Sequence, residues 1–408
     1  MFYPEQFRIN DICTEWVKRG YKVTVITGIP NYPQGKFYNG YGLFKKRRET
    51  FNGIEIIRLP LIPRGSNSIQ LILNYFSFVF SGFFWNLFTN IKADYVFIHM
   101  TSPMTQALIG VWYAQKRKVP CYIYIQDLWP ETVEMISGIK NRLILDGIGK
   151  MVDYIYKHCE KIFTTSKSFV KSIANRGVPE EKIIYWPQYA EDFYVPVARK
   201  NVDEIPIDGA FNIIFTGNIG DAQGLEVLPH TAKILKSKGY GDKVRFNIVG
   251  DGRSKKKLIN EVEKNEVTDM FNFIPRQSPK RIPELLSASD AAFLSFLDVP
   301  LFAMTIPAKL QSYMACGMPI IAAAYGESKE IVEEAQAGIC CPPGEPELLA
   351  EVIIKIVNMD SEQLKQMGRN ARKYYNKHFN KHVLLKKMDN YFNKSNGGKH
   401  LCSKIKHC

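Results

Sequence analysis

The second half of the chain alternates between short apolar runs and longer segments with helical periodicity. Each apolar run has the length of a buried strand, and the segments between them carry apolar residues at intervals of three and four. This alternation predicts a parallel sheet covered by helices on both faces. The predicted strands are 212–216, 244–249, 271–274, 291–296 and 318–324, and the predicted helices are 225–238, 254–264, 279–287, 345–358 and 361–379.

The first half has the same kind of pattern, although no internal sequence repeat is evident. It opens on a helix with apolar residues on one face, which ends at Gly20. A further helix is predicted over 141–158. The predicted strands are 22–27, 94–99, 121–126, 161–165 and 182–186.

A polar segment containing Pro206 separates the two halves, and 408 residues are enough for two or three domains. We therefore predict an N-terminal domain over 1–196, a linker over 197–209 and a C-terminal domain over 210–380. Residues 381–408 are predicted to be the end of the last helix followed by a loose basic tail.

The charge balance narrows the range of partners. Lysine and arginine exceed aspartate and glutamate, which gives a formal net charge of +14. An anionic partner is expected, and without a nucleic-acid-binding motif we expect phosphorylated substrates and acidic lipid rather than nucleic acid. The eight cysteines are scattered without metal-ligand spacing. We therefore expect reduced thiols in a cytoplasmic protein, and no metal site. No signal-peptide pattern opens the sequence.

Residues 69–91 form a stretch without charge that is rich in aromatic side chains, and the basic run Lys45–Arg48 precedes it. The stretch is long enough to span a bilayer, but it contains several polar residues and lies between strand signals of one domain. A helix lying in the membrane interface fits better, with the basic run facing acidic lipid. A core helix and a merely solvated charge run are the alternatives.

The segment 305–321 holds the residue with the most informative placement. Pro307 suits the first turn of a short helix and Gly317 suits the position after its last turn. Lys309 then lies in the first turn, where a cation opposes the helix dipole unless an anion is bound there. The alternative is a solvated lysine whose stem covers apolar surface.

Two glycine-containing loops each follow a predicted strand. Gly217, Asn218 and Gly220 belong to the first loop, and Arg253 closes the second, Gly250–Arg253. Backbone N–H groups at such loops can approach phosphate oxygens. Neither loop is G-x-G-x-x-G, so no nicotinamide cofactor is indicated. Ordinary turns are the alternative for each loop.

Two residues at strand ends of the first half are candidates for catalysis. Asp127 follows the predicted strand 121–126, at the end where α/β sheets keep their ligands. It can orient an acceptor hydroxyl or accept its proton, and a helix N-cap is the alternative. His99 ends the strand before it, and a structural histidine is its alternative.

Several segments, in this order, resemble family-4 retaining glycosyltransferases of the GT-B fold, and most closely the bacterial O-antigen and capsule enzymes that transfer L-fucosamine-type sugars. The segments are YPEQFRIND, VTVITGIPNYPQGKFYNGYG, IQDLWPE, FTGNIGDAQG, VGDGR and PAKLQSYMACGMPII. The resemblance implies an α/β protein with two Rossmann-like domains facing across a cleft, with the last helices returning to the first domain. It also implies a strand before the first helix, and this sequence lacks that strand; a start several residues late is our preferred explanation.

The resemblance also assigns roles at the donor site. It makes Lys309 the ligand of the donor diphosphate, and it implies a metal-independent reaction with a UDP-sugar as substrate and no cofactor. Relatives often carry two glutamates where this sequence has Met304 and Ser312, so Ser312 is left to offer a weaker hydroxyl contact. Asn218 and Gln223 stand where many relatives have an arginine and a lysine.

The function expected from these observations is sugar transfer from a UDP-sugar to a polyprenyl-diphosphate-linked saccharide, at the inner face of the cytoplasmic membrane. The sugar expected from the resemblance is an N-acetyl-deoxyhexosamine such as N-acetyl-L-fucosamine, and the pathway is O-antigen or capsule synthesis. A nucleotide-sugar 2-epimerase of the same fold and a non-catalytic sugar-nucleotide-binding partner are the alternatives.

Overall fold

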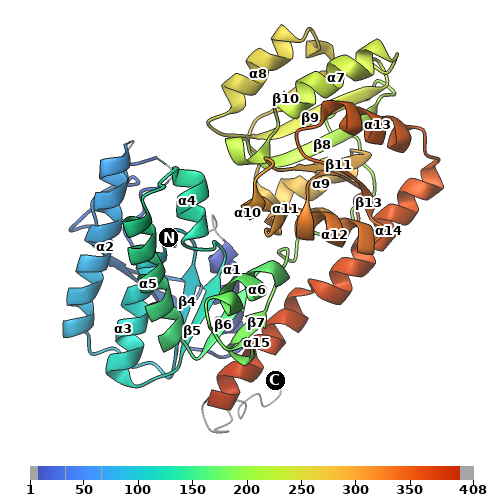
Figure 1. The fold of residues 1–408 in the computed structure, drawn as a ribbon. Helices are drawn as coiled ribbons and strands as arrows, with labels where there is room; N and C mark the ends of the chain where they lie inside the picture. The colour runs from blue at the N-terminus through green and yellow to red at the C-terminus, as the bar shows by residue number, and fades with distance from the viewer. Residues whose placement is uncertain (1–7, 33, 66, 396–408) are drawn as a thin grey trace. The chain divides into compact units, whose positions relative to one another are not determined.

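The computed structural model describes residues 8–32, 34–65 and 67–395, and these form two compact units. The N-terminal unit comprises the described residues up to Thr165, Phe169–Tyr185 and the chain from Lys387. The C-terminal unit comprises Ser166–Ser168 and Trp186–Lys386. Figure 1 shows both units, each built of strands flanked by helices.

The N-terminal unit contains two sheets. The first has three strands in the order β1-β3-β2, with β1 and β3 parallel and β2 antiparallel to β3. The second has four parallel strands in the order β4-β5-β6-β7. The strands are β1 Thr24–Gly28, β2 Arg48–Phe51, β3 Ile54–Leu59, β4 Val96–Met100, β5 Cys121–Ile125, β6 Lys161–Thr164 and β7 Ile183–Tyr185.

The helices of the first half connect these strands. They are α1 Arg8–Lys18, α2 Ser68–Phe88, α3 Ala107–Arg117, α4 Glu131–Ser137, α5 Arg142–His158 and α6 Lys167–Asn175, with the 3-10 turns η1 Met104–Gln106 and η2 Glu180–Lys182. Sequence patterns predicted α1, α5 and the strands other than β2 and β3. The hairpin of β2 and β3 was missed because it begins inside the basic run, where charge hides the strand pattern.

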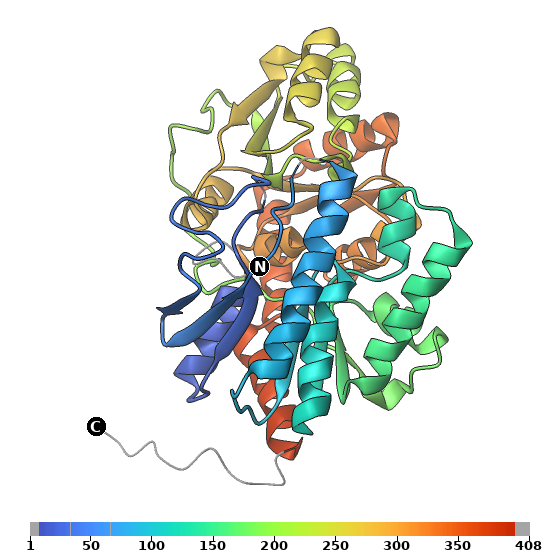
Figure 2. The ribbon, with the colours of Figure 1, turned by 90° about the vertical axis from the view of Figure 1, so that its left-hand side faces the viewer.

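Helix α2 is the predicted uncharged aromatic stretch, and one of its faces packs on α3 (Figure 2). At Gly82 a side chain would collide with Ile109, so the two helices approach closely there. The Asn86 side chain donates a hydrogen bond of 3.0 Å to the Ile109 carbonyl. Trp85 stacks on Tyr113 with ring centroids 5.7 Å apart. The opposite face of α2 is exposed, so α2 is not a core helix.

The C-terminal unit is a six-stranded parallel sheet in the order β10-β9-β8-β11-β12-β13. The chain runs outward from β8 in one direction and then from β11 in the other, so the order reverses between these two central strands. Ligands of such sheets bind at the carboxyl ends of the strands beside the reversal. The strands are β8 Phe211–Asn218, β9 Val244–Asp251, β10 Phe271–Ile274, β11 Ala291–Ser295, β12 Ile320–Ala323 and β13 Gly338–Cys341.

Helices cover both faces of this sheet, which is why its strands read as continuous apolar runs. Ile214, Ala292 and Leu294 belong to the core on one face, with residues of α9, α11, α12 and α14. Ile213, Phe215 and Phe293 belong to the core on the other face, with residues of α7, α8 and α13. The helices are α7 Val227–Ser237, α8 Lys255–Lys264, α9 Ile282–Ser287, α10 Pro300–Ala303, α11 Ala308–Ala315, α12 Gly326–Glu334, α13 Pro346–Val357, α14 Ser361–His378 and α15 Lys381–Ser395, with η3 Asp221–Gln223, η4 Thr268–Met270 and η5 Pro279–Arg281.

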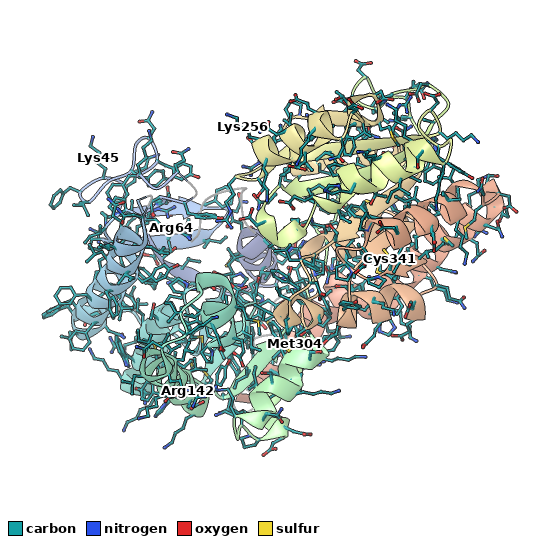
Figure 3. All side chains as sticks on the ribbon, turned by 45° about the horizontal axis from the view of Figure 1, so that its top comes forward. Lys45, Arg64, Arg142, Lys256, Met304 and Cys341 are labelled. Carbon is teal, nitrogen blue, oxygen red and sulfur yellow. The ribbon has the colours of Figure 1, made fainter. Side chains whose placement is uncertain are left out.

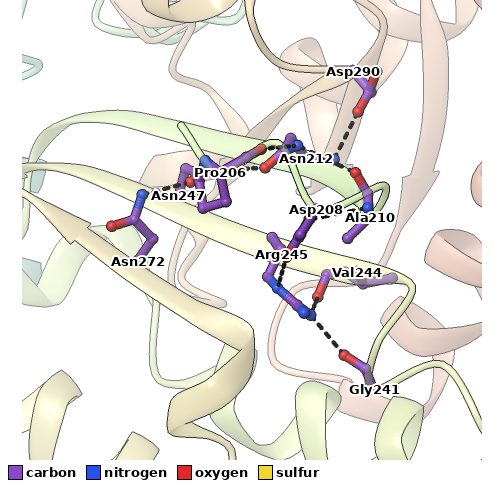
Figure 4. Close-up of polar contacts among 10 residues, drawn as sticks. All are labelled: Pro206, Asp208, Ala210, Asn212, Gly241, Val244, Arg245, Asn247, Asn272 and Asp290. Carbon is purple, nitrogen blue, oxygen red and sulfur yellow. Dashed lines mark hydrogen bonds and ion pairs between the residues drawn. The ribbon is translucent and has the colours of Figure 1, made fainter. Parts of the chain in front are cut away.

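A ladder of three asparagines links three neighbouring strands of this sheet; Asn212 and Asn247 are buried and Asn272 is half-buried (Figure 4). The Asn247 side chain donates to Asn212 Oδ1 at 2.8 Å and accepts from Asn272 Nδ2 at 2.9 Å. The Asn212 and Asn272 amides also bond the carbonyls of Pro206 and Glu204. The ladder therefore holds the segment before β8 against the edge opposite the expected ligand site.

The last helix contributes to the N-terminal unit, as the resemblance implied. Phe392 of α15 stacks on Tyr95 with centroids 4.4 Å apart and contacts Trp16 of α1 edge-on. Asp389 forms an ion pair of 2.6 Å with Arg19. The segment from Lys387 to Ser395 is therefore an integral part of the core that α1 and β4 build. The predicted tail after Ser395 lies outside the described residues.

Candidate active site

The first group of candidate residues lies at the carboxyl ends of β8 and β9, beside the reversal of strand order. Gly217 and Gly250 have φ of +136° and +145°, which side chains rarely tolerate. A Cβ atom on Gly250 would lie 1.9 Å from the Gly217 carbonyl oxygen, and one on Gly252 would lie 2.2 Å from that of Ile219. The two loops are therefore in contact, and glycine is required where they meet.

Lys309 lies in the first turn of α11, as predicted, and its amino group reaches these loops. The Nζ atom lies 3.8 Å from the centroid of the Phe215 ring and donates a 2.5 Å hydrogen bond to Gln223 Oε1. A Cβ atom on Gly217 would be 3.7 Å from it. Burial lowers the pKa of Lys309 from its ordinary 10.5 to about 7.

The surroundings of this lysine lack a counter-ion in the described part of the chain. Its partner Gln223 is neutral, and the first turn of α11 has no acidic residue and no side-chain cap. A buried cation without an acidic partner is costly, and an anion bound at this point removes that cost. The alternative of a solvated surface lysine does not fit the contacts of Lys309.

The remaining donor-site candidates differ in their exposure to solvent and in their partners. Gly217 and Asn218 are exposed in the loop, whereas Gly220 is buried. A Cβ atom on Gly220 would lie 2.6 Å from the side-chain nitrogen of Asn218. Arg253 is 78% exposed and forms a 2.7 Å ion pair with Asp221. The Ser254 hydroxyl also donates to Asp221, and this contact, together with the charge of Arg253, lowers the pKa of the Asp221 carboxyl. Arg253 is thus held at the loop by Asp221, with most of its guanidinium in solvent.

Ser312 is turned back into its own helix. Its hydroxyl donates to the Ala308 carbonyl at 3.2 Å, and the residue is buried. The neighbouring Tyr313 hydroxyl accepts a hydrogen bond of 2.9 Å from the Thr216 backbone N–H, which fixes α11 against β8. Met304 ends the short helix α10 and is labelled in Figure 3.

The second group of candidates lies at the carboxyl ends of β4 and β5 in the N-terminal unit. Asp127 Oδ2 accepts a 2.7 Å hydrogen bond from the Ser102 backbone N–H, so it bridges the loops after the two strands and is not the N-cap of α4. The ring of His99 contacts the Gln126 amide at 2.9 Å and lies 5.8 Å from the Tyr124 ring. Burial and the nearby positive charge of Arg8 lower the pKa of His99 to about 3, so the imidazole is neutral at physiological pH.

No sequence pattern indicated Arg64 or Tyr75 as residues of this group. Arg64, which is labelled in Figure 3, precedes α2. Its guanidinium lies 5.0 Å from the centroid of the Tyr32 ring, and its backbone N–H donates to the Asn31 side chain. Burial raises the pKa of Tyr75 in α2, and the charges of Arg64 and Asp127 act on it in opposite directions. No local pattern brings Arg64, Tyr75 and Asp127 together, because they come from three separate segments.

No group of three or more histidine, cysteine, aspartate or glutamate side chains among the described residues has the arrangement of a metal site. One described helix, Ile69–Phe88, has the length and composition to cross a membrane.

The fold and these two groups of residues define a class of protein: a two-unit α/β protein with a lysine that lacks a described acidic partner at the carboxyl edge of a doubly wound sheet. Comparison with known families agrees. Residues 6–188 match the family described as "Glycosyl transferase 4-like domain", and residues 199–374 match "Glycosyl transferases group 1". The two matches together cover most of the chain, and they identify it as a glycosyltransferase of the hexosyltransferase type.

Individual relatives agree with this assignment, and solved structures agree with the fold. The putative colanic acid biosynthesis glycosyl transferase WcaI of Escherichia coli is 25% identical over 82% of this chain and 84% of its own. Sucrose-phosphate synthase from Thermosynechococcus elongatus superposes with a TM-score of 0.73 at 15% identity, covering 96% of this chain and 93% of that one. Anabaena HepE in complex with UDP gives a TM-score of 0.63 at 14% identity, covering 84% and 87%. The predictions of a GT-B fold and of a glycosyltransferase are confirmed.

Proposed function

We propose that this glycosyltransferase moves a sugar from UDP to a polyprenyl-diphosphate-linked saccharide, with retention of configuration, at the cytoplasmic face of the membrane. The product belongs to a bacterial surface polysaccharide, of the O-antigen or capsule kind, and the sugar is an N-acetyl-deoxyhexosamine such as N-acetyl-L-fucosamine. A relative named for colanic acid biosynthesis and a structural neighbour that holds UDP support this proposal.

The placement of Lys309 is the observation that carries the donor part of the proposal. Its amino group is buried at a helix start, against a glycine loop, among neutral partners. A nucleotide diphosphate supplies the missing negative charge, and the N–H groups at the start of α11 bind its oxygens together with the lysine.

Departure of UDP leaves negative charge on the diphosphate, and the enzyme must stabilise that charge. Lys309 provides a fixed cation, the Gly217–Gly220 loop provides backbone N–H groups, and Arg253 provides an exposed cation that is paired with Asp221. These groups do the work that a metal ion does in other transferases, so we propose a metal-independent reaction without a cofactor.

Asp127 is the proposed catalytic carboxylate on the acceptor side. It lies at the carboxyl edge of the N-terminal unit's second sheet, with one oxygen bonded to the Ser102 N–H. The other oxygen can orient an acceptor hydroxyl or accept its proton. His99 remains neutral, so its proposed role is hydrogen bonding to the acceptor or positioning through Gln126, not charge.

The exposed face of α2 carries the membrane part of the proposal. Its exposed large apolar side chains recur at intervals of three and four; they are Ile69, Ile72, Leu73, Phe76, Phe80, Phe83, Phe84, Leu87 and Phe88. We call this set the α2 stripe. It follows one face of a 21-residue helix about 30 Å long. A stripe of this kind buried in the interface, with Lys45–Arg48 facing acidic lipid, gives peripheral attachment.

A 2-epimerase of the same fold would act on a water-soluble nucleotide sugar and would have no use for the α2 stripe. The stripe therefore favours a transferase with a lipid-linked acceptor. A non-catalytic binding partner would keep Lys309 without needing Asp127.

Titration with UDP, followed by turnover, tests the proposal. We expect UDP to bind the purified protein without added metal, and EDTA to leave the affinity unchanged. Given a UDP-sugar and a lipid extract, the enzyme should release UDP only when the extract is present. Failure to bind UDP in either condition would contradict the donor assignment.

A further inference from the structure

A groove of about 1060 Å³ lies on the N-terminal unit between α2, the segment Leu59–Pro63 and the loop that precedes β2. Its size is at the upper end of the range for small-molecule sites, about 300–1,000 Å³. Phe80, Phe84 and Phe88 of α2 form one wall, and Leu43 and Ile62 contribute to the other side. All five side chains are exposed, so the walls of the groove are apolar and open to solvent.

Hydrogen bonds hold the two sides of the groove in place. The Ser81 hydroxyl donates to the Pro60 carbonyl, and the Asn74 amide donates to the Ile62 carbonyl at 2.6 Å. The Ile62 N–H in turn donates to the Ser77 hydroxyl at 2.9 Å. These bonds fix α2 to the segment after β3, so the groove is preformed and does not depend on a ligand to open it.

The rim of the groove is basic. Arg47 and Arg48 line it, and none of the described residues that line it is acidic. Arg47 uses two of its donors on the carbonyls of Arg58 and Leu43 and makes no ion pair with the described residues. A guanidinium has five N–H donors, so Arg47 retains donors for an anionic ligand. An apolar channel with a cationic rim matches a ligand that has one apolar chain and one anionic head.

The lining of the groove adjoins the segment that carries Arg64. The groove is lined by Leu59, the last residue of β3, and by Pro63, which directly precedes Arg64. Arg64 and Asp127 both act electrostatically on Tyr75. A ligand that extends past Pro63 therefore reaches the segment that carries Arg64. Anchoring to a bilayer needs only the exposed stripe, whereas a recessed groove with a basic rim suits a single chain.

We propose that this groove binds the isoprenoid chain of the acceptor lipid, with the acceptor's diphosphate at Arg47 and Arg48. The inference rests on the proposed function, since it locates the lipid part of the same acceptor. The groove positions the acceptor, and Asp127 then acts on its sugar hydroxyl.

The α2 stripe offers a matched pair of variants. Phe80 lines the groove and is 67% exposed, whereas Phe76, one turn earlier, is 64% exposed and does not line it. Phe80→Asp and Phe76→Asp therefore place the same charge on the same helix at similar exposure. Leu43→Asp, on the opposite wall, provides a second groove variant that leaves α2 unchanged.

Calorimetric titration with farnesyl diphosphate, without detergent or lipid, is the test. We expect the wild type to bind it, Phe80→Asp and Leu43→Asp to bind at least about tenfold more weakly, and Phe76→Asp to remain within about twofold. The double variant Arg47→Gln/Arg48→Gln should lose affinity for farnesyl diphosphate but keep its affinity for farnesol. UDP titration of each variant reports on folding and donor binding.

Equal losses in Phe76→Asp and Phe80→Asp would overturn the inference, because the groove would then be only part of a general apolar surface that also takes phospholipid chains. A wild type that binds UDP but not farnesyl diphosphate would overturn it too, and would leave the proposed donor chemistry intact. A wild type that fails to bind UDP would contradict the proposed function itself.

Discussion

Replacing Lys309 with methionine separates a ligand-binding lysine from a structural one, because the two roles predict opposite changes in stability. Methionine has a similar length and no charge, so Lys309→Met removes the cation and keeps most of the packing. A lysine kept for structure would make the variant less stable. If Lys309 serves to bind an anion, the ligand-free protein carries an unpaired cation, and the Lys309→Met variant should be more stable than the wild type.

The expected gain follows from the pKa. The folded chain releases the Lys309 proton near pH 7, whereas the unfolded chain keeps it until about pH 10.5. A shift of this size corresponds to at most about 4 kcal/mol of destabilisation at neutral pH. Although the amino group packs against Phe215 and Gln223, Lys309 as a whole residue is only half-buried, and this remaining contact with solvent reduces the cost. We therefore expect Lys309→Met to gain about 1–3 kcal/mol. Because the unfolded state binds more protons between pH 7 and 10.5, the gain should be largest below pH 7 and should disappear toward pH 10.5.

Urea unfolding of the ligand-free protein across this pH range measures the gain, with Lys233→Met as control. Lys233 is exposed on α7 of the same unit, so its replacement should change the free energy of unfolding by less than about 0.5 kcal/mol. Calorimetry should show that Lys309→Met loses about 1.5–3 kcal/mol of UDP affinity and keeps its affinity for uridine. For the wild type, UDP affinity should fall above pH 7, since binding then requires uptake of a proton. A less stable variant with unchanged UDP affinity would refute the reasoning.

Three further substitutions test other parts of the account. Asp127→Asn should keep UDP affinity and lose about 10²–10⁴-fold in turnover, and near-normal turnover would reduce Asp127 to a residue that joins two loops. Asn247→Ala should cost about 2–4 kcal/mol in urea unfolding of the C-terminal unit, because it leaves Asn212 Oδ1 buried without its donor; a loss below 1 kcal/mol would contradict the role of the ladder. The triple change Ile69→Asp, Ile72→Asp and Phe76→Asp should make the protein extractable from membranes by salt alone, while its UDP affinity stays the same. If low salt already extracts the wild type fully, the α2 stripe is not an anchor.

The fold of the C-terminal unit was predictable because its strands are buried on both faces. The run Ala291–Ser295, for example, is apolar except for its last residue and is buried throughout, and the helices between such runs have clear periodicity. The strand β13 was missed because it has only four residues, and the helix α12 was missed because its sequence is mostly polar. The order of the strands, and with it the reversal between β8 and β11, is set by contacts between distant segments that no local pattern records.

The candidate sites were predictable to different degrees. Lys309 was identified from its position in a helix, but the contact with Phe215 and Gln223 that buries its amino group depends on β8 and η3. Ser312 looked able to offer a hydroxyl, and the structure turns that hydroxyl into the helix backbone, as serine often does in a helix interior. The α2 stretch was read from its composition, yet only its packing on α3 decides which face is left exposed.

The most direct test of the central claim is a transfer assay with the purified protein, a panel of UDP-sugars and a lipid-linked oligosaccharide extract, followed by mass spectrometry of both the lipid and the nucleotide fractions. The account predicts that one UDP-sugar yields UDP together with a lipid-linked saccharide heavier by a single sugar residue, that the new linkage keeps the anomeric configuration of the donor, and that EDTA does not inhibit. Conversion of the nucleotide sugar to an isomer without any lipid product, or no turnover of any donor, would contradict it.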